Sequence, residues 1–435
     1  MKRHILFISI TILGFISIQA QDVTLLSKDD LTEKVLQNSK LLKISEKSYQ
    51  EAQADYRQTN AIFLPNITAS HTAIATTNPL MAFGSKLNQE ILTVNDFNPT
   101  LLSDPSQIQN FATKIEIQQP IVNLDGIYQR KAAKNKMQAQ DLQIQRTKQY
   151  LELEVEKSYM QLQLAYKAVE VMEKALIASE ENLKLANNSY QQGYLQRADV
   201  LAVDVRVTEV KNQLQSAKSN LANASNYLSF LMDDESYTIY RPVDSLFVSN
   251  IDKDLSLSVS QERADVKAMM MASEAYKAMS KADKMAFLPR LNAFGSYELY
   301  DDEVFQAGAN GYTIGAQLSW NIFEGSKHFA KSQKSKAEYE RSQLEYEQYK
   351  SKSQLELNQA SRMLEDAKNK LALTQLALNQ SEESLRIRTN RYKEGLEKTA
   401  DLLMAETQYA EKQLEYYQTV FEYNYALAYI QFLTQ

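Results

Sequence analysis

Several residue types are rare or missing in this chain, and each absence narrows what the protein can be. There is no cysteine among the 435 residues, which excludes disulfide bonds and thiolate chemistry. Glycine and proline are scarce, at 10 and 7, and a chain with few helix breakers and many good helix formers is mainly helical. The net charge of -6 is mild and no basic tract stands out, so we expect no nucleic-acid partner.

Catalytic and metal-binding patterns are missing as well. Outside the first twenty residues only His71 and His328 remain, and neither lies in a cluster with the spacing of a metal site. The run MMMASEAYKAM at 269–279 is rich in methionine. Consecutive methionines point in different directions around a helix, so we expect packing rather than a Cu(I) site. We therefore expect no enzyme, no metal and no cofactor.

The longest apolar run lies at the start of the chain. MKRHILFISITILGFISIQA has a basic start, about fourteen apolar residues and a small residue at Ala20, which predicts a signal peptide over residues 1–20. No later run approaches the length of a membrane-spanning helix. Such a chain is expected to be periplasmic, secreted or part of an outer-membrane barrel.

The rest of the chain consists of two similar repeats. YQQGYLQRADVL from Tyr190 returns as YKEGLEKTADLL from Tyr392, an offset of 202 residues (392 minus 190). AIFLPNI near Phe63 likewise matches MAFLPRL near Phe287. A repeat this long is a duplicated domain rather than a solenoid unit. We expect a first repeat over 21–232, an inter-repeat equatorial segment over 233–260 and a second repeat over 261–435.

Each copy predicts the same order of elements: a helix ending at FLP, two strands, a very long helix and a returning helix. Asp29 and Asp30 are expected to cap the first helix. The expected helices are Asp30–Ile62, Gly126–Ser189 and Ala198–Met232 in the first copy, and Gln261–Phe287, Gly325–Asn390 and Ala400–Leu433 in the second. Each long helix matches the summed length of two short ones, which predicts short helices stacked end to end beside it in a cylinder about 100 Å tall.

The strands alternate between apolar and polar residues. YTIGAQLSW, from Tyr312 to Trp320, is the clearest case, because its apolar side chains all point to one face. We expect this face to contact lipid through Tyr312, Ile314, Leu318 and Trp320. The connection between strands is long in the first copy, about 76–110, and short in the second.

Four strands of this length raise a closure problem. Open sheet edges are not tolerated in lipid, and the smallest known barrels have about eight strands. The chain must therefore form an oligomer, in which two, three or four copies would supply eight, twelve or sixteen strands.

Taken in order, these features resemble TolC-type outer membrane efflux proteins. The resemblance implies a mainly α fold with a small β part and a duplicated helix-strand-strand-helix unit. It also implies a homotrimer with a long coiled-coil-like α-helical barrel and a twelve-stranded transmembrane β-barrel, four strands per chain. Such a channel lies in the outer membrane of a Gram-negative bacterium with a long periplasmic portion, and docks on a periplasmic adaptor (membrane fusion) protein and an inner-membrane transporter.

The resemblance also places the two repeated loops at the periplasmic tip, where the channel is gated. The implied tip residues are Tyr190, Gly193, Asp199, Arg391, Tyr392, Gly395 and Asp401. The aspartates can cap the returning helices or face the lumen. The sequence departs from the best-known pattern at Met404, where a second acidic ring is common, and at Glu397, where a basic residue is common, so the closing contacts are expected to differ.

The expected function is a passive outer-membrane exit duct of a tripartite efflux system. Two alternatives stay open. One is an outer-membrane channel for type I protein secretion, which uses the same architecture. The other is a soluble periplasmic coiled-coil adaptor or structural protein, which leaves the four alternating strands unexplained.

Overall fold

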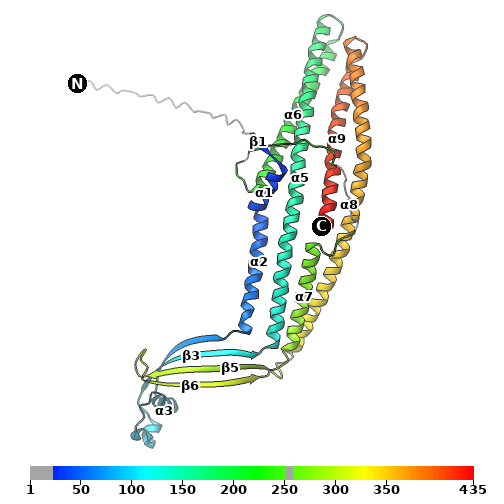
Figure 1. The fold of residues 1–435 in the computed structure, drawn as a ribbon. Coiled ribbons are helices and arrows are strands. Elements are labelled where there is room, and N and C mark those ends of the chain that lie inside the picture. Colours follow the sequence, from blue (N-terminus) through cyan, green and yellow to red (C-terminus); the bar gives the residue numbers. More distant parts are fainter. Residues whose placement is uncertain (1–22, 237, 250–257) are drawn as a thin grey trace, which may run out of the picture. The chain divides into compact units, whose positions relative to one another are not determined.

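The computed structural model describes residues 23–236, 238–249 and 258–435, and Figure 1 shows their elements in chain order. The predicted signal peptide lies outside the described residues. The chain divides into two units. The first holds residues 23–43, 147–259 and 354–435, and the second holds residues 44–146 and 260–353.

Four helices confirm the predicted duplication. α5 (Leu124–Gln191) and α8 (Lys327–Lys393) have 68 and 67 residues. The returning helices α6 (Arg197–Met232) and α9 (Thr399–Thr434) have 36 residues each. The ends lie within a few residues of the expected ones, because a glycine turn separates each long helix from its returning helix.

The short helices differ from the prediction in two respects. The expected first helix is split into α1 (Lys28–Asn38), α2 (Lys40–Gln58) and the 3-10 turn η1 (Thr59–Ile62), since Ser39 leaves the helical region with ψ 121°. The cap of α1 is Ser27, whose hydroxyl accepts a hydrogen bond from the Asp30 N–H at 3.1 Å. Asp29 and Asp30 lie within the first turn, where acidic side chains favour the helix dipole. The matching helix of the second copy is α7 (Ala264–Met285).

Separate apolar clusters pack the helices of the first unit together. One cluster joins α8 to α9 through Leu357, Leu364 and Ile430. A second cluster, around Val169 and Leu214, brings α5 and α6 together with Ala410 of α9. Side chains spaced by three and four residues on each helix therefore face a neighbouring helix, as in coiled-coil packing.

The inter-repeat segment 233–260, for which the sequence predicted no regular element, contains a strand. β4 (Ile239–Pro242) pairs in parallel with β1 (Val23–Leu26). Four-residue strands carry too little alternation to be recognised, and their pairing joins segments far apart in sequence. In the same unit α1 lies against α6, and the Lys40 ammonium lies 2.6 Å from the Asp233 carboxylate at the end of α6.

The second unit contains an antiparallel sheet in the order β2-β3-β5-β6, formed by Asn66–Thr76, Ile108–Val122, Arg290–Asp301 and Ala309–Ser319. Its register separates two faces. The apolar face carries Ile67, Ala69, Ile115, Ile117, Leu291, Tyr297, Tyr312, Ile314 and Leu318. The polar face carries Thr68, Ser70, Lys114, Glu116, Asn292, Ser296, Thr313 and Gln317.

The long connection between β2 and β3 is an ordered segment rather than a plain loop. It contains α3 (Pro79–Asn88), the 3-10 turn η2 (Val94–Phe97) and α4 (Pro99–Ser103). Asn78 and Asn98 cap α3 and α4, and each is followed by proline at the first helical position. This Asn-Pro arrangement is a strong helix start.

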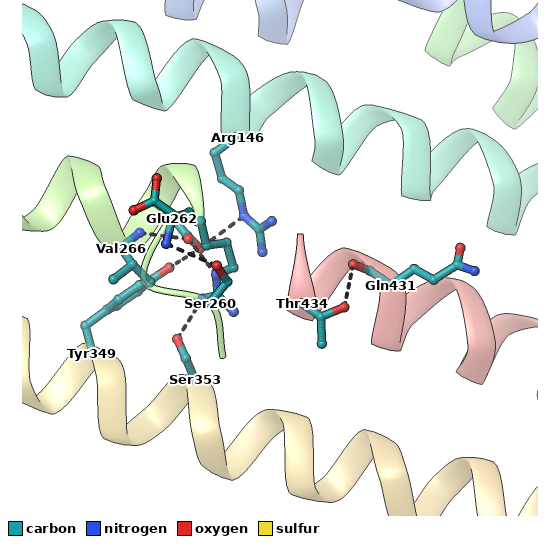
Figure 2. A network of polar contacts seen from close by, with 10 residues as sticks. Arg146, Ser260, Glu262, Val266, Tyr349, Ser353, Gln431 and Thr434 are labelled. Carbon is teal, nitrogen blue, oxygen red and sulfur yellow. Dashed lines mark hydrogen bonds and ion pairs between the residues drawn. The ribbon is translucent and has the colours of Figure 1, made fainter. Parts of the chain in front are cut away.

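A buried charge network holds α7 against α5 and α8 in the second unit (Figure 2). The Asp265 carboxylate accepts from Arg263 Nε at 2.6 Å and from Arg146 Nε at 3.0 Å. The Tyr349 hydroxyl donates to it at 2.7 Å, and Arg263 also donates to the Ser353 hydroxyl at 2.7 Å. Burial opposes ionisation of Asp265, but the hydrogen bonds from Arg263 and Tyr349 and the charge of Arg146 outweigh it and lower the pKa of Asp265.

Candidate functional site

The two repeated loops adopt the same backbone turn. Gly193 and Gly395 have φ values of +79° and +72°, a region that glycine enters without the steric cost of a side chain. The N–H of Gly193 donates to the Tyr190 carbonyl at 3.0 Å, and the N–H of Gly395 donates to the Tyr392 carbonyl at the same distance. The next residue donates five positions back in both loops. Both loops therefore end their long helix with a Schellman motif.

The aspartates after each turn lie in the first turn of the returning helix. Asp199 closes a capping box, in which its carboxylate accepts from the Gln196 N–H at 3.3 Å. This contact accounts for Asp199 as a capping residue. Asp401 has the same offset from its glycine and is half-buried in the first turn of α9.

The side chains around the two tyrosines are different. Tyr190 is 41 % exposed, and Arg197 lies over its ring at 6.0 Å from the centroid. Tyr392 is 7 % exposed, and its buried hydroxyl has no hydrogen-bond partner within the described residues. A buried hydroxyl without a hydrogen-bond partner costs free energy. The Tyr392 hydroxyl therefore lowers the stability of the second tip.

An ion-pair clip crosses the second tip. Glu397 accepts from Arg388 at 2.8 Å through one carboxylate oxygen and from Arg391 at 2.8 Å through the other. Arg391 also donates to the Leu396 carbonyl at 3.1 Å. The hydrogen bond from Arg391, together with the charges of both arginines, lowers the pKa of Glu397. Glu397 thus joins the last turns of α8 to the loop that follows them.

A polar cluster that the sequence analysis missed lies between the two hairpins. Asn182 of α5 donates to one oxygen of Glu406 on α9. The other oxygen of Glu406 and the Nε of Arg206 on α6 are buried and lack hydrogen-bond partners in the described part of the chain. Burial raises the pKa of Glu406 to about 7, although the charge of Arg206 and the hydrogen bond from Asn182 lower it. The copies differ here, since Asp204 occupies the matching position in α6 and is exposed.

A groove of about 700 Å³ runs beside the clip of the second tip. Its lining residues come from the last turns of α8 and the loop, and they are Asn379, Gln380, Glu383, Ser384, Ile387, Arg388, Arg391 and Glu397. No group of His, Cys, Asp and Glu within the described ranges has the arrangement of a metal site. The helices described here include none that is both long and apolar enough to cross a membrane.

The expected lipid-facing side chains all lie on or beside the apolar face of the sheet. Tyr312, Ile314 and Leu318 project from β6 and are 76 %, 79 % and 68 % exposed. Trp320 follows the strand, and its indole Nε1 donates to the Phe287 carbonyl at 2.9 Å. Large apolar side chains with this exposure need a partner that the described part of the chain does not supply.

Several solved outer-membrane proteins have the same fold as this chain. VceC from Vibrio cholerae matches with a TM-score of 0.79 and 18% identity over 94% of this chain and 96% of that one. CmeC from Campylobacter jejuni matches with a TM-score of 0.81 and 15% identity over 94% and 85%. CusC matches with a TM-score of 0.79 and 16% identity over 93% and 91%. At these identities the likeness shows the fold.

The chain belongs to the outer membrane efflux protein family, whose model matches residues 31–233 and 255–433. No curated protein matches it in sequence. Family membership makes it an efflux channel of the outer membrane and not an enzyme, as the sequence predicted.

Proposed function

We propose that the protein is the outer-membrane exit duct of a tripartite efflux system. Three chains assemble into one channel, and a periplasmic adaptor protein and an inner-membrane transporter deliver solutes to it. Solutes cross it passively, and the two hairpin tips gate its periplasmic end. The observation that carries this proposal is a two-faced sheet with unpaired outer strands in a chain of this family.

The sheet supports assembly through its edges. β2 and β6 are the outer strands of a four-stranded sheet, and each has one edge of backbone donors and acceptors that no strand of this sheet pairs. Lipid cannot satisfy these groups, and four strands are too few to close on themselves. Three chains give twelve strands and remove every edge.

Aromatic side chains flank the apolar face at both ends. At one end, His71 stacks on Phe305 with ring centroids 4.4 Å apart and on Phe111 at 6.2 Å. At the other end, Phe287 packs against Phe329 at 5.3 Å, close to Trp320. The nine residues from Tyr312 to Trp320 span about 27 Å in an extended conformation, or about 20 Å when tilted, which suits the apolar band of an outer-membrane protein.

Charge placed on either face of β6 tests this arrangement. Ile314→Lys should reduce the yield of trimers that resist dissociation in unheated detergent gels, because a lysine in the middle of the lipid-facing band costs about 2–4 kcal/mol. Thr313→Lys is the matched control on the polar face, and its trimers should form normally. Normal assembly of Ile314→Lys together with loss of Thr313→Lys would reverse the assigned facing, and a stable monomer without pore activity would refute the channel.

The clip at the second tip tests the gate. Glu397→Gln removes the charge shared by Arg388 and Arg391, so we expect more frequent opening in planar bilayers at moderate salt. Glu383→Gln is the control, because among the described residues Glu383 pairs only with Arg386, at 2.7 Å, on the same helix. Equal opening of both variants and the parent chain would exclude the clip from gating.

A further inference from the structure

The two copies connect their strands in different ways. In the second copy, Tyr300 and Ala309 form the last strand pair, and only residues 301–308 join them. In the first copy, Thr76 and Ile108 form the last pair, and residues 77–107 join them. These residues, called the lid segment below, include α3 and lie against one end of the sheet (Figure 1).

The lid segment covers the polar face and leaves the apolar face open. The strand residues buried at this end are Ile108, Asn110 and Ala309, at 8 %, 7 % and 1 % exposure. All three belong to the polar face by register, whereas the adjacent apolar-face residues Gln109 and Asn310 are exposed. The opposing stripe on α3 is Ala82, Ser85 and Gln89, whose spacing places them on one side of the helix.

Gln89 anchors this contact. Its side-chain nitrogen lies 2.8 Å from the Gln109 carbonyl, 2.9 Å from the Asn110 side-chain oxygen and 3.1 Å from the Asp301 carbonyl. Gln89 is 6 % exposed. One buried amide therefore ties the end of α3 to both β3 and β5.

The lid segment also has contacts of its own that hold it in shape. The Lys86 ammonium lies 2.7 Å from the Asp96 carboxylate, and the rings of Phe83 and Phe97 meet edge to face at 5.7 Å. Asp96 also accepts from the Thr93 N–H at 2.8 Å in a capping box. These contacts join α3 to η2, so the segment behaves as a folded unit rather than a flexible loop.

We propose that residues 77–107 form a lid over the polar face at the outer end of the sheet and set the largest solute that the channel releases. This inference rests on the proposed function, because the polar face becomes the channel wall only in the assembled barrel. Three chains then carry three such lids at the mouth. The second copy adds no lid, since its connection is too short to cover the face.

The absence of native cysteine allows a direct test on intact cells. Thr313→Cys places one thiol on the polar face beyond the lid, and Glu303→Cys places one thiol in the exposed short connection. Each is combined with the natural lid or with residues 77–107 replaced by the Asp301–Gly308 connection of the second copy. A maleimide coupled to a bulky polyethylene glycol should modify Thr313→Cys much faster without the lid, whereas a small impermeant maleimide should modify it at similar rates in both.

Gln89→Ala provides a second test at constant chain length. It removes the anchor and should also speed modification of Thr313→Cys by the bulky reagent, whereas Asn88→Ala, exposed on the same helix, should not. Equal rates with and without the lid, in trimers whose Glu303→Cys thiol reacts normally, would overturn the lid while leaving the channel intact. Failure of Glu303→Cys to react from outside the cell, or absence of trimers, would instead count against the proposed function.

Discussion

The two hairpin tips share one backbone and differ in the side chains around it. Both turns have glycine with positive φ and the same pair of backbone hydrogen bonds. The first tip has an exposed Tyr190 and a capping Asp199. The second tip has a buried Tyr392, the Arg388–Glu397–Arg391 clip and, on the returning helix α9, Glu406 with one buried carboxylate oxygen. The two copies thus share the turn that reverses the chain, while the ion-pair clip and the buried tyrosine are found at the second tip.

The largest expected difference between the copies is the pH response of Glu406. Its pKa of about 7 in the packed hairpins lies above the ordinary value of 4.5. The contribution of protonated Glu406 to the free energy of unfolding is therefore complete below its ordinary pKa and is lost as the pH rises through 7. Between pH 5 and pH 8 this contribution falls by about 2 kcal/mol. Glu406→Gln should raise the melting temperature at pH 8 and flatten its dependence on pH, as followed by circular dichroism. The exposed counterpart Asp204→Asn should leave both unchanged, and an unaltered pH profile in Glu406→Gln would contradict the assigned burial.

Substitution of the two tip glycines should have the next largest effect on stability, and the loss should be the same at both tips. Gly193→Ala and Gly395→Ala each force a side chain into the left-handed region, which costs about 1.5 kcal/mol. The space around both glycines is open, so no clash adds to this cost. Hydrogen exchange of each tip measures the change. A large inequality between the two variants would mean that the turns are not equivalent.

Substitution of the two tip tyrosines should change stability by a smaller amount, and the change should differ between the tips. Tyr392→Phe removes a buried hydroxyl that has no partner among the described residues and should stabilise the protein by about 1 kcal/mol. Tyr190→Phe acts at an exposed ring and should change the melting temperature little. A loss of stability in Tyr392→Phe would reveal a partner for this hydroxyl in the assembled channel.

The aspartates should give the smallest effects on stability and the clearest functional contrast. Asp199→Ala loses its capping contact, which costs up to about 1 kcal/mol. Asp401→Ala should instead raise single-channel conductance or lessen block by divalent cations, if three such carboxylates converge in the trimer. Unchanged currents in Asp401→Ala would remove this residue from the gate.

Residue pattern alone was sufficient for the features that repeat. Long helices follow from the scarcity of glycine and proline, and the strands follow from alternation in segments such as Tyr312–Trp320. The tip turns follow from Gly193 and Gly395 at matching offsets. In each case the signal is local, because capping, turn geometry and period depend on residues a few positions apart.

Contacts between distant segments were decided only by the tertiary structure. Three examples join residues that are far apart in the sequence, so no local pattern predicts them. They are the β1–β4 pair, the Arg146–Asp265–Tyr349 network and the Asn182–Glu406 contact. The same holds for the lid segment, whose helices start at recognisable Asn-Pro caps but whose choice of face depends on the register of β3. The residue pattern predicts the long helices, the four strands of the large sheet and the repetition of these elements, but not the short strands β1 and β4. Packing determined which charges are buried, because burial depends on neighbours that the chain brings together only when it folds.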